Sequence, residues 1–152
     1  MISAEHPDPL SKRRLKTWIR LLGVTRQVEN RLREFLRVNH NTTLPRFDVM
    51  AALWRRREGI GMTELSRMLL VSNGNATAVV ARLEEDGLVQ RMRKPDDGRA
   101  ILVALTDAGL RQFERIAAAH EKAVSRLFAG LTDTDLDLLT DILRRARTEE
   151  SK

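Results

Sequence analysis

The 152-residue chain contains no cysteine and no stretch of eighteen consecutive apolar residues. Without cysteine the protein can form no disulfide, no thiolate metal ligand and no thiol-based redox switch. Without a long apolar run no transmembrane helix is expected, so a membrane is not among the predicted partners. The polar segment 1–14 also lacks the apolar centre of a secretory signal peptide. These absences predict a cytoplasmic protein that does not sense oxidants through thiol chemistry.

No catalytic or metal-binding pattern is present either. The three histidines, His6, His40 and His120, are far apart, and none has a second ligand-type residue four positions further on. A serine nucleophile would need a base and an orienting acid, and no motif supplies them. Tyrosine is absent, and residues 73–75 lack the lysine of a phosphate-binding loop. We therefore expect no enzyme, no metal site and no bound cofactor.

The chain is basic, and its positive charge is unevenly distributed. The formal net charge is +6, and the excess of lysine and arginine lies in residues 1–57. A basic protein suits a polyanionic partner, because binding releases the counterions of that partner. Two interpretations stay open for these cations. They form a solvated helix face whose aliphatic stems cover apolar surface, or they contact phosphates or an anionic ligand.

The chain is organised around residues 61–105. Residues 63–69 have apolar side chains at helical spacing, and a turn follows at residues 70–71. Ser72 then stands where a helix N-cap is expected, because its hydroxyl can accept from the free N–H groups of the next turn. The second helix stops near Gly87, a residue that accepts a positive φ. Its predicted buried stripe comprises Ala76, Val80 and Leu83.

A β-hairpin is predicted directly after these two helices. Residues 88–92 and 101–105 favour strands, and the turn-rich residues 95–98 connect them. Helix, turn, helix and hairpin in this order are typical of a winged helix-turn-helix, with the helix-turn-helix at 62–86 and the wing at 88–105. The predicted fold class is mainly α with a small β-hairpin wing.

The exposed face of the second helix favours contact with DNA bases. No charged residue occurs from 71 to 81, so small side chains and amides would face the major groove, where asparagine can pair with adenine. The cations of the hairpin would lie beside that helix. A protein-interaction module that uses the same charged wing is the alternative. The residues predicted to contact double-stranded DNA are Ser72, Asn73, Gly74, Asn75, Thr77, Ala78, Arg82, Arg91, Arg93, Lys94, Asp97 and Arg99.

This stretch resembles the MarR-type winged helix-turn-helix regulators, and the resemblance covers almost the whole chain. It is carried by residues 65–91, by residues 96–109 and by the long helices on both sides. By that resemblance Arg99 would enter the minor groove or grip its phosphates, oriented by Asp97. Alternatively, Asp97 is a turn residue that bonds its own backbone. Leu70 is a departure, because many helix-turn-helix turns carry glycine there.

Long amphipathic helices flank the winged region. One is predicted over residues 11–38, with an interruption of its apolar pattern near Arg26, and two more begin after the N-caps Thr106 and Thr132. Residues 1–10 are expected to be flexible. The remaining parts form one domain over 11–149, with dimerisation helices at 11–44 and 107–149 and the winged region at 45–106.

These flanking helices have little core of their own to cover. Pairing with a second copy around a two-fold axis would bury their apolar stripes, although an intramolecular bundle in a monomer is the alternative. The resemblance also implies a homodimer. A two-fold dimer presents two recognition helices to successive major grooves, so the operator is expected to be a pseudo-palindrome. The predicted interface residues are Leu22, Leu127, Phe128, Leu136, Leu139 and Leu143.

The resemblance further implies a small-molecule effector bound between the dimer lobe and the winged region, and a repressor that this effector releases from DNA. Aromatic acids are the expected class. The candidate walls of the pocket are Trp18, His40, Phe47, Met50 and Trp54. An aromatic acyl-CoA thioester is the second possibility, because a group of arginines could hold its phosphates by bidentate contacts. That group comprises Arg31, Arg33, Arg37 and Arg46.

Overall fold

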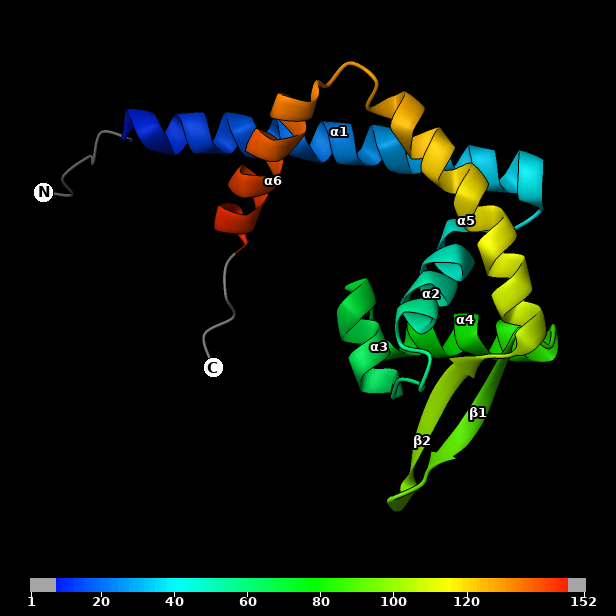
Figure 1. The fold of residues 1–152 in the computed structure, drawn as a ribbon. Helices are drawn as coiled ribbons and strands as arrows, with labels where there is room; N and C mark the ends of the chain where they lie inside the picture. The colour runs from blue at the N-terminus through cyan, green and yellow to red at the C-terminus, as the bar shows by residue number, and fades with distance from the viewer. Residues whose placement is uncertain (1–7, 148–152) are drawn as a thin grey trace, which may run out of the picture.

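The computed structural model describes residues 8–147, which form six helices and one β-hairpin. The predicted fold class, mainly α with a hairpin wing, is confirmed. The helices are α1 (Pro9–His40), α2 (Leu44–Arg55), α3 (Met62–Leu69), α4 (Asn73–Glu85), α5 (Asp107–Leu127) and α6 (Asp133–Ala146). The hairpin consists of β1 (Val89–Lys94) and β2 (Asp97–Leu105). In Figure 1, α2, α3, α4 and the hairpin hang below one end of α1, and α5 leads from the hairpin back to α1.

Helix α1 is longer and more regular than the sequence pattern predicts. It begins at Pro9 rather than at residue 11, because the Asp8 carboxylate accepts a hydrogen bond from the Leu10 N–H at 3.0 Å and proline suits the first helical turn. The helix is continuous at Arg26, where its apolar pattern is interrupted. Residues 23–27 are all exposed, so the gap in the apolar pattern marks a turn that buries nothing. Residues 1–7, also predicted to be flexible, lie outside the described residues.

The N-caps predicted for three helices are confirmed. The Ser72 hydroxyl accepts from the Asn75 N–H at 3.2 Å, and the Thr106 hydroxyl accepts from the Gly109 N–H at 3.1 Å. At the start of α6 the Thr132 N–H donates to the carboxylate of the residue three positions on at 2.9 Å, which completes a capping box. These bonds join residues at most three positions apart, which is why the sequence alone could place them.

The hairpin is longer than predicted. Its strands pair antiparallel from Val89 opposite Leu105 to Lys94 opposite Asp97, with an irregularity next to Lys94. The predicted loop over residues 95–98 therefore shrinks to residues 95 and 96, and Asp97 belongs to β2. Ile60 adds a short third segment, because it exchanges backbone hydrogen bonds of 2.9 and 2.8 Å with Val103.

The core lies where α2, α3, α4 and the hairpin meet the end of α1 and the first half of α5. Gly109 shows how closely α5 approaches the hairpin. A Cβ atom at that position would lie 1.9 Å from the backbone oxygen of Leu88, so only glycine fits. The largest of the fully buried side chains are Leu36, Met50, Leu53, Ile60, Leu65, Leu83, Val49, Val80 and Val103. None of the helices within residues 8–147 is long and apolar enough to cross a membrane.

Candidate nucleic-acid interface

Helix α4 is held in place by its apolar stripe. Ala76, Val80 and Leu83 are buried against α2 and α3, as predicted. The opposite side of the helix is therefore turned outwards. The predicted contact residues on this side are all exposed: Ser72, Asn73, Gly74, Asn75, Thr77, Ala78 and Arg82. Because this face carries no charge before Arg82, close approach to base edges would leave no acidic or basic group unpaired.

The two asparagines of α4 differ in what they can offer to a base. The side chain of Asn73 is hydrogen-bonded to the hydroxyl of Ser66, a buried residue of α3. Part of its amide is therefore already used within the protein. Asn75 makes no side-chain hydrogen bond among the described residues, so its oxygen and its N–H₂ group are both available. A two-bond contact with adenine needs both groups, which favours Asn75 over Asn73.

The turn between α3 and α4 is built with a leucine in a glycine-like conformation. Leu70 has φ 55° and ψ 40°, and its N–H closes α3 by bonding the carbonyl oxygens of Arg67 and Ser66. Leucine replaces the glycine that many helix-turn-helix turns carry at this position, and the tight turn forms nonetheless. The Leu70 side chain is 92% exposed, so no packing contact offsets the cost of the left-handed conformation.

On the wing, the structure distinguishes between the predicted contact residues. Arg93, Lys94 and Arg99 are exposed, and within residues 8–147 none of them is in an ion pair. Arg91 differs, because its guanidinium lies 3.2 Å from the carboxylate of Glu84 on α4. That pair links the wing to the recognition helix.

Asp97 takes the second of its two predicted roles. Its carboxylate accepts a hydrogen bond from the backbone N–H of Arg99 at 3.1 Å, and it forms no ion pair with the Arg99 guanidinium. The aspartate therefore shapes the backbone at the start of β2, as a turn residue does. The guanidinium of Arg99 is left without an acidic partner among the described residues.

An aromatic cluster lies between α2 and α5. The Phe47 ring stacks on the imidazole of His120 with centroids 4.2 Å apart, and Phe113 lies 5.4 Å from Phe47 and 5.8 Å from Trp54. Partial burial lowers the pKa of His120 below its ordinary value. The sequence predicted neither Phe113 nor His120 as part of the effector pocket, and His120 was a candidate only for a metal ligand. Their separation of seven residues, which places both on one face of a helix, was the signal that could have joined them.

The other three predicted walls of the effector pocket do not join this cluster. Trp18 and His40 lie at opposite parts of α1, roughly 33 Å apart at 1.5 Å per residue, and Trp18 is exposed. His40 packs against Phe35 and lines a separate hollow beside α5. Met50 is part of the buried core. Within one protomer, Phe47 and Trp54 belong to the aromatic cluster, Met50 shares a core with Phe47, and Trp18 and His40 lie elsewhere on α1.

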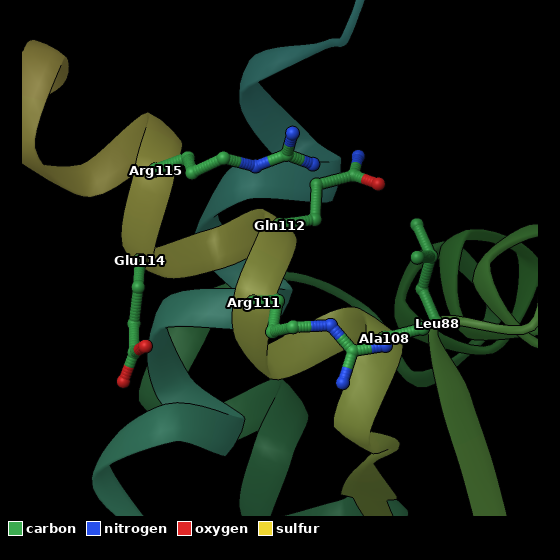
Figure 2. Close-up of a pocket in the computed structure, with 6 residues that line it drawn as sticks. All are labelled: Leu88, Ala108, Arg111, Gln112, Glu114 and Arg115. Atoms are coloured by element: carbon green, nitrogen blue, oxygen red, sulfur yellow. The ribbon is translucent and has the colours of Figure 1, made fainter.

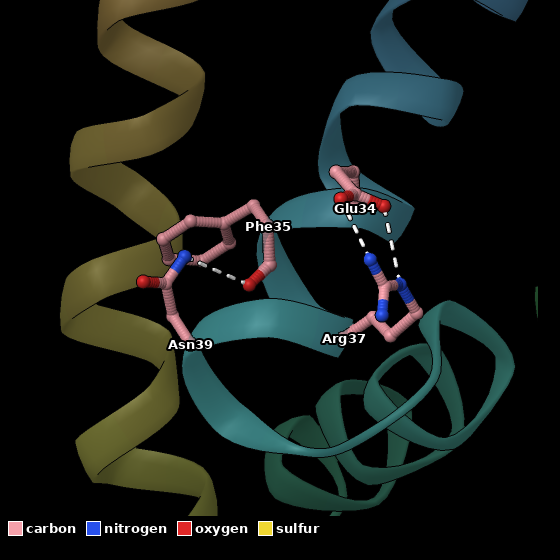
Figure 3. Close-up of polar contacts among 4 residues, drawn as sticks. All are labelled: Glu34, Phe35, Arg37 and Asn39. Atoms are coloured by element: carbon pink, nitrogen blue, oxygen red, sulfur yellow. Dashed lines mark hydrogen bonds and ion pairs between the residues drawn. The ribbon is translucent and has the colours of Figure 1, made fainter.

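The arginines predicted to hold a CoA ligand are mostly paired with acids. Arg33 lies 3.4 Å from Glu29, and Arg37 makes two hydrogen bonds, of 2.8 and 3.2 Å, with Glu34. Figure 3 shows the second pair, beside the hydrogen bond from the Asn39 amide to the Phe35 carbonyl oxygen. Arg46 lies 2.5 Å from Asp86. Of the four, only Arg31 has no acidic partner among the described residues.

A shallow hollow on α5, not predicted from the sequence, carries further cations. It is lined by Leu88 and by residues of the first turns of α5, among them Arg111, Gln112 and Arg115. Figure 2 shows these three side chains pointing to one side of the helix, whereas Glu114, which also lines the hollow, points away from them. Neither arginine is in an ion pair with a described residue.

Helix α6 has an apolar stripe that the rest of residues 8–147 leaves largely uncovered. None of its residues is buried. Leu127, Phe128 and Leu139 line a groove with α1, whereas Leu136 and Leu143 are exposed, and Leu22 is half-buried. Trp18 and Ile19 of α1 add to this exposed apolar surface. Within residues 8–147, no group of three potential ligand residues is arranged to hold a metal ion.

Comparison with known proteins agrees with this geometry. A model of the MarR family matches residues 42–101. A MarR family transcriptional regulator from Silicibacter pomeroyi is 30% identical, and its structure superposes with a TM-score of 0.77 over 91% of this chain and 96% of that one. The chain belongs to the MarR family. In the winged helix-turn-helix fold of this family, α4 occupies the place of the recognition helix, and β1–β2 occupies the place of the wing.

Other MarR family members and relatives extend the comparison. A MarR family regulator from Streptomyces coelicolor, solved in complex with DNA, is 26% identical, with a TM-score of 0.80 over 93% of this chain and 90% of that one. The transcriptional repressor IacR of Pseudomonas putida is 32% identical over 66% of this chain and 59% of its own length. The regulator YkoM of Bacillus subtilis is 38% identical over 53% and 52%. The chain thus spans about half to three fifths of these curated relatives.

Proposed function

We propose that this protein is a sequence-specific DNA-binding transcriptional regulator that represses its target as a homodimer. One observation carries the proposal. An uncharged recognition face on α4 lies beside a wing whose cations Arg93, Lys94 and Arg99 have no acidic partner among the described residues. Neutral polar groups suit base edges in the major groove, and free cations suit the phosphates on either side.

The comparisons support this proposal. The Streptomyces coelicolor relative was solved with DNA bound, and its fold matches this chain over 93% of its length. The Pseudomonas putida relative is described as a repressor, which favours repression here. A winged helix that binds only proteins would not need the uncharged face of α4.

The proposed homodimer explains the uncovered surface of α6. Pairing that surface and the N-terminal half of α1 with a second copy would bury Leu136, Leu143 and Trp18. A two-fold axis would place two α4 helices about one DNA turn apart, so we propose a pseudo-palindromic operator.

For the effector, we propose a small aromatic acid that binds at the aromatic cluster. The rings of Phe47, Trp54, Phe113 and His120 would pack against its ring. A ligand that binds one spacing of the two recognition helices better than the other would shift the population away from the DNA-binding form. An aromatic acyl-CoA has less support, because three of the four arginines assigned to its phosphates already have acidic partners.

The proposal is tested by fluorescence-anisotropy titration with DNA from upstream of the protein's own gene, in the presence of competitor DNA. We expect saturable binding that resists the competitor. Arg99→Ala should weaken it by about 1–3 kcal/mol while leaving the oligomeric state unchanged. Arg115→Ala, which removes another exposed cation, one on α5, is the matched control and should have a smaller effect.

The possible outcomes distinguish a sequence-specific DNA-binding regulator from a protein-interaction module. Binding that competitor DNA abolishes would contradict sequence-specific recognition. Unchanged affinity of Arg99→Ala would contradict the assignment of the wing. No binding at any ionic strength would favour the protein-interaction module.

A further inference from the structure

Among the ion pairs of the described residues, the Arg46–Asp86 pair contains the least exposed arginine side chain, whereas its Asp86 side chain is 52% exposed. The Arg46 guanidinium lies 2.5 Å from the Asp86 carboxylate, and its side chain is only 21% exposed. The arginine side chains in the other ion pairs are at least 35% exposed. The two residues are forty positions apart in the sequence. The pair joins the first turn of α2 to the C-cap of the recognition helix α4.

Each partner occupies the end of its helix that disfavours its charge. The N-terminus of a helix carries partial positive charge and its C-terminus partial negative charge. Arg46 adds a cation to the first turn of α2, which has no acidic residue, and Asp86 adds an anion at the C-terminus of α4. Local electrostatics would favour the opposite arrangement. The pair therefore exists because of the contact between the two helices and in spite of the sequence around each residue.

The opposite end of α4 is tied down as well. The side chain of Asn73, the first residue of the helix, is hydrogen-bonded to the buried Ser66 of α3. The recognition helix is thus anchored by polar contacts at both ends and by Ala76, Val80 and Leu83 along its buried face. An apolar stripe still allows a helix to slide and tilt, because packing is not directional, whereas a two-ended polar anchor sets its angle.

We propose that Arg46 is a positioning residue for DNA recognition: through Asp86 it sets the angle at which α4 meets the major groove. This inference rests on the proposed function. We do not propose that Arg46 contacts a base, because it acts through α4. Loss of the pair should reduce specific binding, which needs α4 to be correctly aligned, much more than non-specific binding, which depends on phosphate contacts.

The test compares full-length variants for binding to operator DNA and to unrelated DNA, with thermal unfolding measured in parallel. Arg46→Gln and Asp86→Asn should each weaken operator binding about tenfold and change binding to unrelated DNA less than about twofold. Arg46→Lys keeps the charge and should recover most of the loss. The double variant Arg46→Asp/Asp86→Arg restores the pair with both charges favoured by their helix ends, and it should recover operator affinity.

The matched control is the pair Glu34–Arg37 on α1 (Figure 3). It has the same chemistry but is exposed and lies within one helix. Arg37→Gln should leave operator affinity unchanged. If Arg46→Gln lowers specific and non-specific binding equally, or changes neither, the positioning role is overturned. Failure of the charge-swapped double variant to recover affinity while it remains folded would also contradict it.

A second readout does not depend on DNA. Amide hydrogen exchange in the last turn of α4 should become faster in Arg46→Gln, relative to the same turn in Arg37→Gln. If the wild-type protein binds no operator, the proposed function fails, and this exchange measurement alone decides whether the pair anchors α4. Unchanged exchange there would overturn the inference.

Discussion

Helix α2 is apolar over most of its surface, whereas α6 carries its apolar residues on one face, and the two helices have very different surroundings. Helix α2 buries six of its twelve residues, whereas α6 buries none of its fourteen. Helix α2 lies between α4, α5 and the hairpin, and α6 crosses the far half of α1 in Figure 1. The periodicity of a helix thus determines which face is apolar. What covers that face depends on neighbours, and for α6 we propose that the neighbour is a second copy.

The largest effects are expected when one leucine in each of these two helices is replaced by alanine. Leu53 of α2 is 0% exposed and Leu143 of α6 is 44% exposed. Leu53→Ala should lower the free energy of unfolding by about 2–5 kcal/mol, because it leaves a cavity in the core. Leu143→Ala should instead raise the dimer dissociation constant by about tenfold or more.

Urea denaturation and sedimentation equilibrium over a range of protein concentrations check both expectations. The stability lost in Leu143→Ala should shrink as the protein is diluted below its dissociation constant. A loss that does not depend on concentration would contradict the comparison, since it would mean that the chain itself covers α6.

A smaller effect concerns backbone strain at two positions of the winged region that have a positive φ. Leu70→Gly should raise the free energy of unfolding by about 1 kcal/mol, because glycine adopts the left-handed conformation without the steric cost that leucine bears. Gly87→Ala is the matched opposite change. Gly87 has φ 72°, and an added Cβ would meet nothing within 4 Å, so backbone strain alone should destabilise it. Thermal unfolding measures both effects. A shift of the unfolding temperature in the same direction for both variants would contradict the proposed role of backbone strain at the two turns.

The smallest expected effect is a pH dependence at the aromatic cluster. Burial lowers the pKa of His120 in the folded protein, so protonation favours the unfolded chain. The stability contributed by neutral His120 is present at pH values above the ordinary histidine pKa of about 6.5 and is lost as the pH falls through and below it. His120→Phe keeps a ring against Phe47 and removes the titration. Unfolding measured at pH 7.5 and 5.5 should show a smaller difference for the variant, and equal differences would contradict the assignment.

Much of the fold was predictable because it depends on short-range rules. The N-caps at Ser72, Thr106 and Thr132 involve bonds over three residues. The stripe of α4 follows helical periodicity. The wing signal was also correct in type, but its length was not, because antiparallel pairing carried the strands into the residues predicted as loop.

Less of the site was predictable. The exposed face of α4 and the presence of basic residues on the wing followed from the sequence, whereas the acidic partners of Arg91 and Arg46 did not. The group of arginines on α1 suggested an anion site, but acidic residues one helical turn away pair with Arg33 and Arg37. Phe113 and His120 meet Phe47 only after α5 folds back onto α2.

Short-range patterns along the chain specify the helices, their caps, the helix-turn-helix with its wing and the resemblance to the family, because these depend on residues within a few positions of one another. Long-range packing sets which cations keep their charge free, which asparagine of α4 has its whole amide available, and which ends of the recognition helix are anchored. Those outcomes depend on contacts between residues that are distant in the chain, such as Arg46 with Asp86. No local pattern encodes such a contact, since at both of its residues local helix electrostatics favours the opposite charge.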